Sequence, residues 1–220
     1  YQRTFHWQSD GYLSRASAQK YDLGVELVFL GSGDAMRRQV IPPLVDALKG
    51  NEAPRVLDVA TGTGRTLQHM AAALPKARVT GLDLSPYYLA EARRRLQDEV
   101  NVSFVAENAE RLPFDMNWFQ AIVSVFLFHE LPRAVLKTVL AEMFRALEPG
   151  GTLVICDSIQ LNDAPELGFF MARFADELHE PFYKDYVKTS LEELVEQAGF
   201  TYVETKDAFM AKVVVAKKPA

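Results

Sequence analysis

The sequence has 220 residues, of which 49% are hydrophobic and 24% charged, so it can form one globular core and lies outside the disordered class of proteins. Its formal net charge is −5, and the sequence has no Arg- or Lys-rich stripe. Both features argue against a surface that binds the phosphate backbone of a nucleic acid, so we expect no nucleic-acid partner. The single cysteine, Cys156, excludes a disulfide framework and a multi-thiolate metal site and indicates a reducing, cytoplasmic compartment.

The first fifty residues have the pattern of helices. Helical stretches are predicted over residues 14–30 and 35–48, with a Gly31-Ser32-Gly33 hinge between them and Pro42-Pro43 interrupting the second. We therefore expect a helical N-terminal cap over residues 1–50, ahead of one domain over residues 51–220. The chain begins at Tyr1 rather than at a methionine, so we expect further residues to precede it.

From residue 55 onward, short apolar or β-branched runs alternate with amphipathic helical stretches, the pattern of parallel strands with helical crossovers. Strands are predicted over residues 55–60, 78–83, 102–106, 121–125 and 152–157. Runs at 201–205 and 212–217 are separated by a short connection and are typical of an antiparallel hairpin. The expected fold class is α/β, a doubly wound, mostly parallel seven-stranded sheet ending in that hairpin. Residues 160–188 are expected to form a helical lid over one end of the sheet.

Two loops that follow predicted strands carry residues suited to a nucleoside. Ligands of open parallel sheets bind beyond the carboxyl ends of the strands. The first loop contains Gly62 and Gly64, where a ligand can approach the backbone, with the carboxylate of Asp58 nearby. About 20 residues later, Asp83 ends the next strand and is placed to accept both hydroxyl groups of a ribose. Leu67 stands where a dinucleotide fingerprint has its third glycine, which argues against a nicotinamide oxidoreductase.

These loops belong to an ordered set of motifs that resembles the Rossmann-like, class I S-adenosylmethionine-dependent methyltransferases. The motifs are the run from Val56 to Gly64, Gly81-Leu82-Asp83-Leu84-Ser85, Ala109-Glu110-Arg111-Leu112-Pro113-Phe114 and Pro149-Gly150-Gly151. The resemblance implies S-adenosylmethionine as the cofactor and no metal ion. The cofactor-binding residues that it implies are Asp58, Ala60, Thr61, Gly62, Gly64, Asp83, Leu84, Asn108, Ala109 and Val125.

Within this set, the resemblance assigns each part of the cofactor to a part of the chain. The methionine moiety is expected against Ala60 and the two glycines, the ribose on Asp83, and the adenine between Leu84 and the Asn108-Ala109 pair. Ala60 replaces the family's commonest first glycine, which is tolerable if its φ angle is negative. Asn108 replaces the usual aspartate and keeps one acceptor oxygen without the charge. A simple turn residue is the alternative interpretation of Asn108.

Candidate catalytic residues follow the fourth predicted strand and lie in the lid. His129 is placed to take up a proton near neutral pH, with Glu130 holding its other ring nitrogen. The alternative is a structural part in shaping the loop. Tyr183, in the run His179-Glu180-Pro181-Phe182-Tyr183, is the third candidate, and Tyr12 and Tyr21 come from the N-terminal region. For each tyrosine, packing is the alternative to chemistry.

The segments Tyr21-Asp22-Leu23, Met36-Arg37-Arg38 and 145–151 are similar to the ubiquinone/menaquinone-biosynthesis C-methyltransferases. The resemblance implies a small methyl acceptor, aromatic, quinone-like or a secondary metabolite, methylated on carbon or oxygen. The alternative function is a cofactor-binding but non-catalytic partner subunit. No apolar stretch approaches the roughly 20 residues of a bilayer crossing, so we expect no membrane span. A homodimer is left open.

Overall fold

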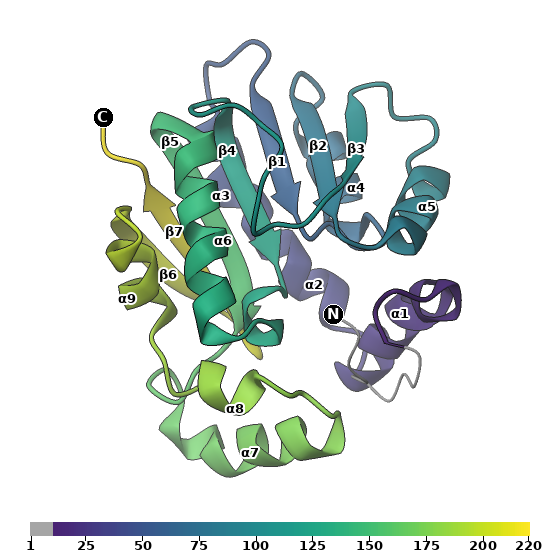
Figure 1. Ribbon diagram of the computed structural model, residues 1–220, viewed down its shortest axis with the longest axis vertical. Helices are drawn as coiled ribbons and strands as arrows, with labels where there is room; N and C mark the ends of the chain where they lie inside the picture. The colour runs from purple at the N-terminus through teal and green to yellow at the C-terminus, as the bar shows by residue number, and fades with distance from the viewer. Residues whose placement is uncertain (1–10) are drawn as a thin grey trace.

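Across residues 11–220, the part of the chain that it describes, the computed structural model contains a seven-stranded sheet with helices on both faces (Figure 1). The strand order is β3-β2-β1-β4-β5-β7-β6, with β1 to β5 parallel and β7 antiparallel to both of its neighbours. The strands are β1 (Arg55–Val59), β2 (Arg78–Asp83), β3 (Val102–Ala106), β4 (Phe119–Val125), β5 (Leu147–Ser158), β6 (Thr201–Ala208) and β7 (Ala211–Lys217). The prediction of a mostly parallel sheet with a C-terminal antiparallel hairpin is confirmed.

Two hydrophobic clusters, one on each face of the sheet, hold the helices in place. One cluster joins α3 and α4 to the sheet through Leu44 and Met70, and the other joins α6 and α9 through Leu140 and Leu194. The helices and 3₁₀ turns are α1 (Arg15–Val28), α2 (Gly33–Arg37), η1 (Arg38–Val40), α3 (Ile41–Ala47), α4 (Arg65–Ala73), α5 (Pro86–Arg95), η2 (Phe128–Glu130), α6 (Arg133–Ala146), η3 (Pro165–Leu167), α7 (Gly168–Glu177), α8 (Tyr183–Tyr186) and α9 (Leu191–Gln197).

The strand order reverses at β1, and this reversal decides where a ligand can bind. From β1 the chain passes to β2 and β3 on one side, and later to β4 and β5 on the other. The loops after β1, β2 and β4 therefore meet beyond the carboxyl ends of neighbouring strands, where open α/β sheets leave a crevice.

The N-terminal helices differ from their prediction at the prolines. Pro42 and Pro43 lie in the first turn of α3, so they begin that helix, and the break falls in η1 before them. A proline in the first turn lacks only an N–H that would have no partner inside the helix. Helix α1 starts as predicted, with the Ser14 side chain accepting from the Ser17 amide at 3.2 Å.

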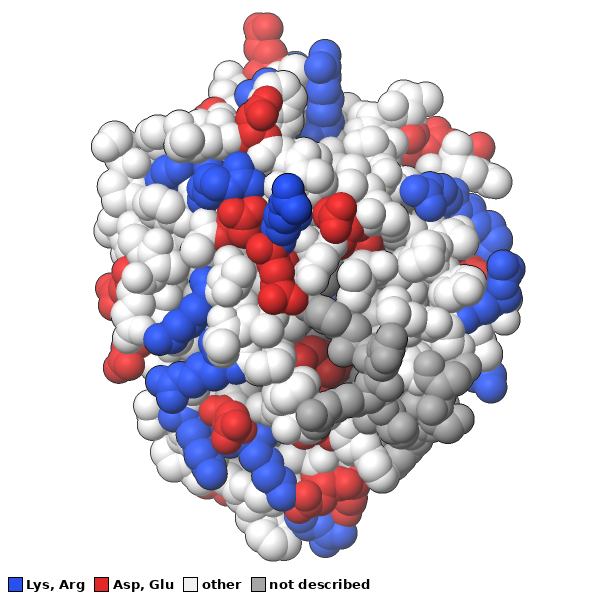
Figure 2. Space-filling model, viewed as in Figure 1, with Lys and Arg blue, Asp and Glu red and all other residues white. Residues whose placement is uncertain are grey.

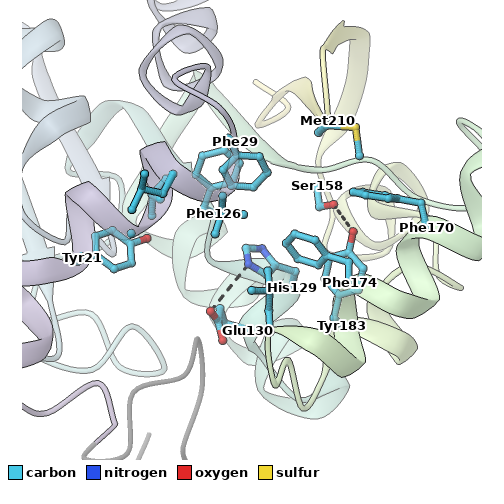
Figure 3. Close-up of a pocket in the computed structure, with 15 residues that line it drawn as sticks. Tyr21, Phe29, Phe126, His129, Glu130, Ser158, Phe170, Phe174, Tyr183 and Met210 are labelled. Carbon is cyan, nitrogen blue, oxygen red and sulfur yellow. Dashed lines mark hydrogen bonds and ion pairs between the residues drawn. The ribbon is translucent and has the colours of Figure 1, made fainter.

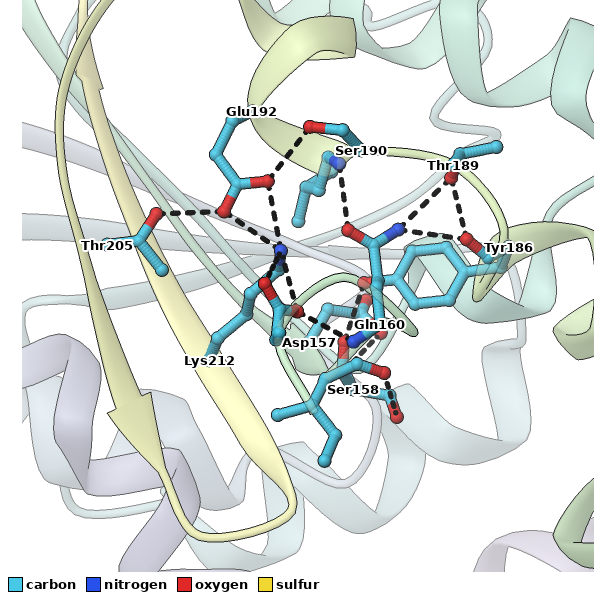
Figure 4. A network of polar contacts seen from close by, with 12 residues as sticks. Asp157, Ser158, Gln160, Tyr186, Thr189, Ser190, Glu192, Thr205 and Lys212 are labelled. Carbon is cyan, nitrogen blue, oxygen red and sulfur yellow. Dashed lines mark hydrogen bonds and ion pairs between the residues drawn. The ribbon is translucent and has the colours of Figure 1, made fainter. Parts of the chain in front are cut away.

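A buried polar network fastens the lid to the sheet (Figure 4). The Gln160 side chain donates to the Tyr186 carbonyl at 2.9 Å and accepts from the Leu191 amide at 2.9 Å. On β7, the Lys212 ammonium is 1% exposed and lies 2.8 Å from Glu192 and 2.9 Å from Asp163. The first end of the lid is therefore tied to α9 and β7, and its other end, at Tyr186, is bonded to Gln160, which holds α7 and α8 beside the carboxyl end of the sheet.

The surface in Figure 2 carries Lys and Arg interspersed with Asp and Glu over the described part of that face. Within residues 11–220, no helix combines the length and the apolar character that a bilayer crossing needs.

Candidate active site

Two adjoining pockets lie at the carboxyl end of the sheet. The first, the Asp83 pocket, has a volume of about 160 Å³ and is bordered by the loops after β1, β2, β3 and β4. The second, the His129 pocket, has a volume of about 230 Å³ and lies between α1, η2 and α7. The two pockets share Tyr21, Phe126 and Glu130. A molecule in one pocket is thus in reach of a molecule in the other.

Asp83 presents both carboxylate oxygens at the Asp83 pocket. The Gly62 amide donates to Oδ2 at 2.8 Å and the Ser85 amide donates to Oδ1 at 2.8 Å. The Tyr12 hydroxyl lies 3.0 Å from Oδ1 and 2.8 Å from Oδ2. Burial raises the pKa of Asp83 to about 6, although the hydrogen bonds from Ser85, Tyr12 and Gly62 act in the opposite direction. At neutral pH the group is therefore a charged acceptor that two backbone amides hold in position.

The pocket brings together most of the residues that the sequence assigned to the cofactor. Among residues 11–220, a Cβ atom at Gly62, where φ is +57°, would have only Tyr88 within 4 Å, at 3.9 Å, so these residues leave open space beside its backbone. The lining residues that were predicted are Ala60, Gly62, Asp83, Leu84, Asn108, Ala109 and Val125.

Three other predicted residues build the turn and do not line the pocket. The Thr61 hydroxyl donates to Asp58 at 2.6 Å, and both residues are buried. Burial raises the pKa of Asp58 to about 7. A Cβ atom at Gly64 would lie 3.0 Å from Ala92 Cβ, so this glycine allows α5 to pack closely against the turn. These three residues therefore stabilise the turn without lining the pocket.

The two departures from the family pattern have different outcomes. Ala60 has a φ of +61°, so the condition under which alanine is tolerated here without strain, a negative φ, is not met. The turn demands a left-handed residue at this point, with the next amide, that of Thr61, bonded to the Leu82 carbonyl at 3.0 Å. Asn108 lines the pocket and also accepts from the Glu110 amide at 2.9 Å, so the turn interpretation and the pocket interpretation both apply to it.

The His129 pocket has aromatic walls and a polar floor (Figure 3). Phe29 and Phe126 stack with ring centroids 6.1 Å apart, and Phe174 lies 5.1 Å from Tyr183 on the lid side. The Tyr183 hydroxyl is 2.7 Å from the Ser158 hydroxyl. Burial raises the pKa of Tyr183 to about 12, so this phenol keeps its proton at neutral pH. The pocket suits a planar, mostly apolar molecule with polar substituents at one end.

At the floor, His129 is held by a residue that the sequence analysis did not single out. Its Nδ1 lies 2.7 Å from Asp157 Oδ1, whereas its Nε2 is 3.8 Å from Glu130 Oε1. Burial lowers the pKa of His129, but Asp157, with smaller contributions from Glu130 and Glu180, raises it to about 10. The imidazole is therefore already protonated at neutral pH, which differs from the expectation that it takes up a proton there. Asp157 ends the predicted strand 152–157, and that strand neighbours the one that precedes His129. This position at the strand end is the feature of the sequence that could have identified Asp157 as a partner of His129.

Comparisons with known proteins agree with this arrangement. A family model described as a methyltransferase domain matches residues 56–151. The demethylmenaquinone methyltransferase of Chlorobaculum tepidum is 31% identical over 197 residues, which cover 84% of this chain and 78% of that protein. The ubiquinone/menaquinone biosynthesis C-methyltransferase UbiE of Methylobacterium nodulans is 30% identical over 211 residues, covering 86% and 81%. The crystal structure of a SAM-dependent methyltransferase from Aquifex aeolicus has a TM-score of 0.64 at 20% identity, covering 93% of this chain and 98% of its own.

The fold, the Asp83 pocket and these relatives define a class I methyltransferase that uses S-adenosylmethionine. The chain belongs to the family that contains the demethylmenaquinone and UbiE-type C-methyltransferases. The open space at Gly62 and the paired acceptor oxygens of Asp83 fit a nucleoside cofactor.

Proposed function

We propose that the chain methylates a small aromatic, quinone-like acceptor bound in the His129 pocket, on carbon or on oxygen. The contact of this pocket with the Asp83 pocket, through Tyr21, Phe126 and Glu130, carries the proposal. The relatives named for demethylmenaquinone and for ubiquinone/menaquinone biosynthesis support an acceptor with a quinone-type ring. The aromatic walls of the pocket are chemically suited to such a ring.

The Asp83 pocket would hold the cofactor through a few groups. The Asp83 carboxylate would accept from the ribose hydroxyls, and the open backbone at Gly62 would lie against the methionine part. The apolar side chains of Leu84, Ala109 and Val125 would border the adenine, with the Asn108 side chain at its edge. The bound cofactor supplies a methyl group on a positively charged sulfur, which is already strongly electrophilic. The protein's own work is then to align the acceptor and exclude water.

The floor of the His129 pocket would handle the acceptor's oxygen substituents. A phenolic ring becomes a better nucleophile when its hydroxyl group loses a proton, and the acceptor must release one proton for each methyl group that it gains. Tyr183 keeps its own proton and can donate to an acceptor oxygen. Glu130 borders both pockets, and His129 presents Nε2 on the Glu130 side of the ring. We assign to the Glu130 carboxylate the uptake of the proton that the acceptor releases, and to His129 and Tyr183 the contacts that stabilise the acceptor oxygen afterwards.

The direct test is turnover with methyl-labelled S-adenosylmethionine and a panel of quinols and phenols, read by mass spectrometry. The expected result is one added methyl group per acceptor. Glu130→Gln and Tyr183→Phe should lower turnover while the affinity for S-adenosylhomocysteine stays within about twofold. Asp83→Asn should weaken cofactor binding, whereas Asp46→Asn, at an exposed position on α3, should not. Cofactor binding without product from any quinol or phenol would contradict the proposal and favour a non-catalytic subunit.

A further inference from the structure

Three side chains with metal-ligating atoms meet at the boundary between the two pockets. His129 and Glu130 belong to η2, directly after β4, and Glu180 comes from the lid between α7 and α8. One ligand atom from each of them lies within 4.8 Å of the other two. His129 is 8% exposed and Glu180 4% exposed, so the cluster is largely withdrawn from water.

The imidazole of His129 is oriented in the way that metal-binding histidines usually are. Its Nδ1 faces Asp157, and Nε2 is left on the side of Glu130. Asp157 is fully buried and also accepts from the Phe128 amide at 2.7 Å and the Ser158 amide at 2.8 Å. A carboxylate on the far nitrogen fixes the ring and makes the near nitrogen a better ligand. This contact is independent of the spacing of the three ligand atoms.

The chain around Glu180 is shaped to bring that carboxylate back to the cluster. The Glu180 amide donates to the Ala175 carbonyl at 3.0 Å, which closes the end of α7. The preceding residue, His179, has a φ of +59°, the left-handed conformation that commonly follows the last residue of a helix. This helix ending reverses the chain direction directly before Glu180.

We propose that His129, Glu130 and Glu180 bind one divalent metal ion at this boundary. The ion takes the place of the proton on His129 Nε2. One imidazole nitrogen with carboxylate oxygens suits Mn²⁺, Fe²⁺ or Zn²⁺. A point equidistant from three atoms 4.8 Å apart lies about 2.8 Å from each, so closing to the roughly 2.0–2.2 Å of bonded ligands needs shifts of less than about 1 Å. The sequence analysis had expected no metal, because the resemblance implies none. The three ligands come from segments 50 residues apart, and only folding brings them together.

A metal ion at this point also limits which molecules suit the acceptor pocket. This part of the inference rests on the proposed function. His129 and Glu130 line the His129 pocket, so an ion that they hold is close to the oxygens of a bound acceptor. An ion at this point favours an acceptor with two neighbouring oxygen atoms that can bind it together. Its positive charge would stabilise the oxygen that has lost its proton.

The test is titration of the chelator-treated protein with Mn²⁺, without cofactor or acceptor, followed by electron paramagnetic resonance. We expect one equivalent of Mn²⁺ to lose its free-ion signal, and the ion to raise the melting temperature. Glu180→Gln should abolish this binding, whereas Glu166→Gln, an exposed carboxylate on the same lid, should leave it unchanged. Asp157→Asn should weaken it by about 10- to 100-fold, as changes to a residue behind a metal ligand do.

Retention of the full free-ion signal at millimolar Mn²⁺, or equal binding by the Glu180 and Glu166 variants, would overturn the metal proposal. Circular dichroism of each variant shows whether it is folded, and a folded Glu180→Gln that binds Mn²⁺ normally counts against the site. Methyl transfer by protein that binds no metal would refute this inference and leave the proposed function intact. Metal binding without methyl transfer to any acceptor would refute the proposed function and leave the metal site intact.

Discussion

The hydroxyl group of Tyr12 lies between the two carboxylate oxygens of Asp83, 3.0 and 2.8 Å from them. A carboxylate has about four lone-pair positions, and the Gly62 and Ser85 amides already use two of them. Tyr12 therefore occupies the acceptor positions that the proposed ribose would need. Its ring also stacks on Tyr88 with centroids 4.3 Å apart, which keeps it over the pocket.

Removing the Tyr12 hydroxyl should make cofactor binding tighter. Tyr12→Phe keeps the stacked ring and loses a hydrogen bond worth about 0.5–1.5 kcal/mol, so the dissociation constant of S-adenosylhomocysteine should fall by about 2- to 10-fold in calorimetry. Tyr87→Phe, on the half-exposed neighbour of Tyr88, is the matched control and should change nothing. Weaker binding in Tyr12→Phe would mean that the hydroxyl stays in place and helps to hold the ribose.

Cofactor binding should weaken in mild acid. The pKa of Asp83 is raised to about 6, so the group is an ionised acceptor above pH 6 and becomes protonated as the pH falls through that value. Protonation removes acceptor capacity, so the dissociation constant should be constant from pH 7 to 8 and rise by up to about tenfold per pH unit below 6. Calorimetry across pH 5 to 8 measures this directly. A flat profile down to pH 5 would show that this carboxylate does not bind the cofactor.

Ala60 is a position where glycine should stabilise the protein. With φ at +61°, alanine is strained by about 1–2 kcal/mol, and glycine relieves the strain at a smaller entropic cost. Ala60→Gly should raise the free energy of unfolding by about 0.5–1 kcal/mol in urea denaturation. Ala72→Gly, on the exposed face of α4, should lower it by about the same amount. An equal decrease in the free energy of unfolding in both variants would contradict the claim that Ala60 is strained.

The lid should depend on the buried ion pairs of Lys212. Lys212→Met leaves Glu192 and Asp163 facing each other without the ammonium, but both carboxylates are partly exposed, so the loss should be about 2 kcal/mol rather than the larger cost of a fully buried pair. Lys206→Met, at an exposed pair on β6, should cost less than about 1 kcal/mol. Limited proteolysis should cut residues 160–188 faster in the first variant only. Equal rates of cleavage in both variants would show that the stability of the lid does not depend on the ion pairs of Lys212.

The sequence predicted the sheet well because local patterns determine it. Each parallel strand is a short apolar run, and the motif after β1 and the acid at the end of β2 have fixed offsets from those runs. The sheet brings these loops together, so Gly62 and Asp83 followed from spacing, whereas the rest of the predicted wall of the Asp83 pocket followed from the family resemblance. The cap of α9 is also a local contact, in which the Ser190 hydroxyl accepts from the Glu193 amide at 3.1 Å.

The remainder of the site depends on contacts that spacing does not encode. Tyr12 reaches Asp83 across 71 residues, and Asp157 reaches His129 across 28. The first contact was missed because the segment before α1 has no motif. The sequence therefore did not indicate whether Tyr12 lies at the cofactor or at the acceptor. The positive φ of Ala60 was missed because alanine gives no sign of a left-handed conformation that the surrounding turn imposes.

The central claim is that Asp83 and the turn at Gly62 bind the cofactor beside the His129 pocket. A crystal structure of the protein soaked with S-adenosylhomocysteine tests it most directly. We predict a ribose on the Asp83 carboxylate, in the place of the Tyr12 hydroxyl, with the sulfur pointing toward Phe126 and Glu130. A cofactor bound elsewhere, or one whose sulfur points away from the His129 pocket, would contradict the account.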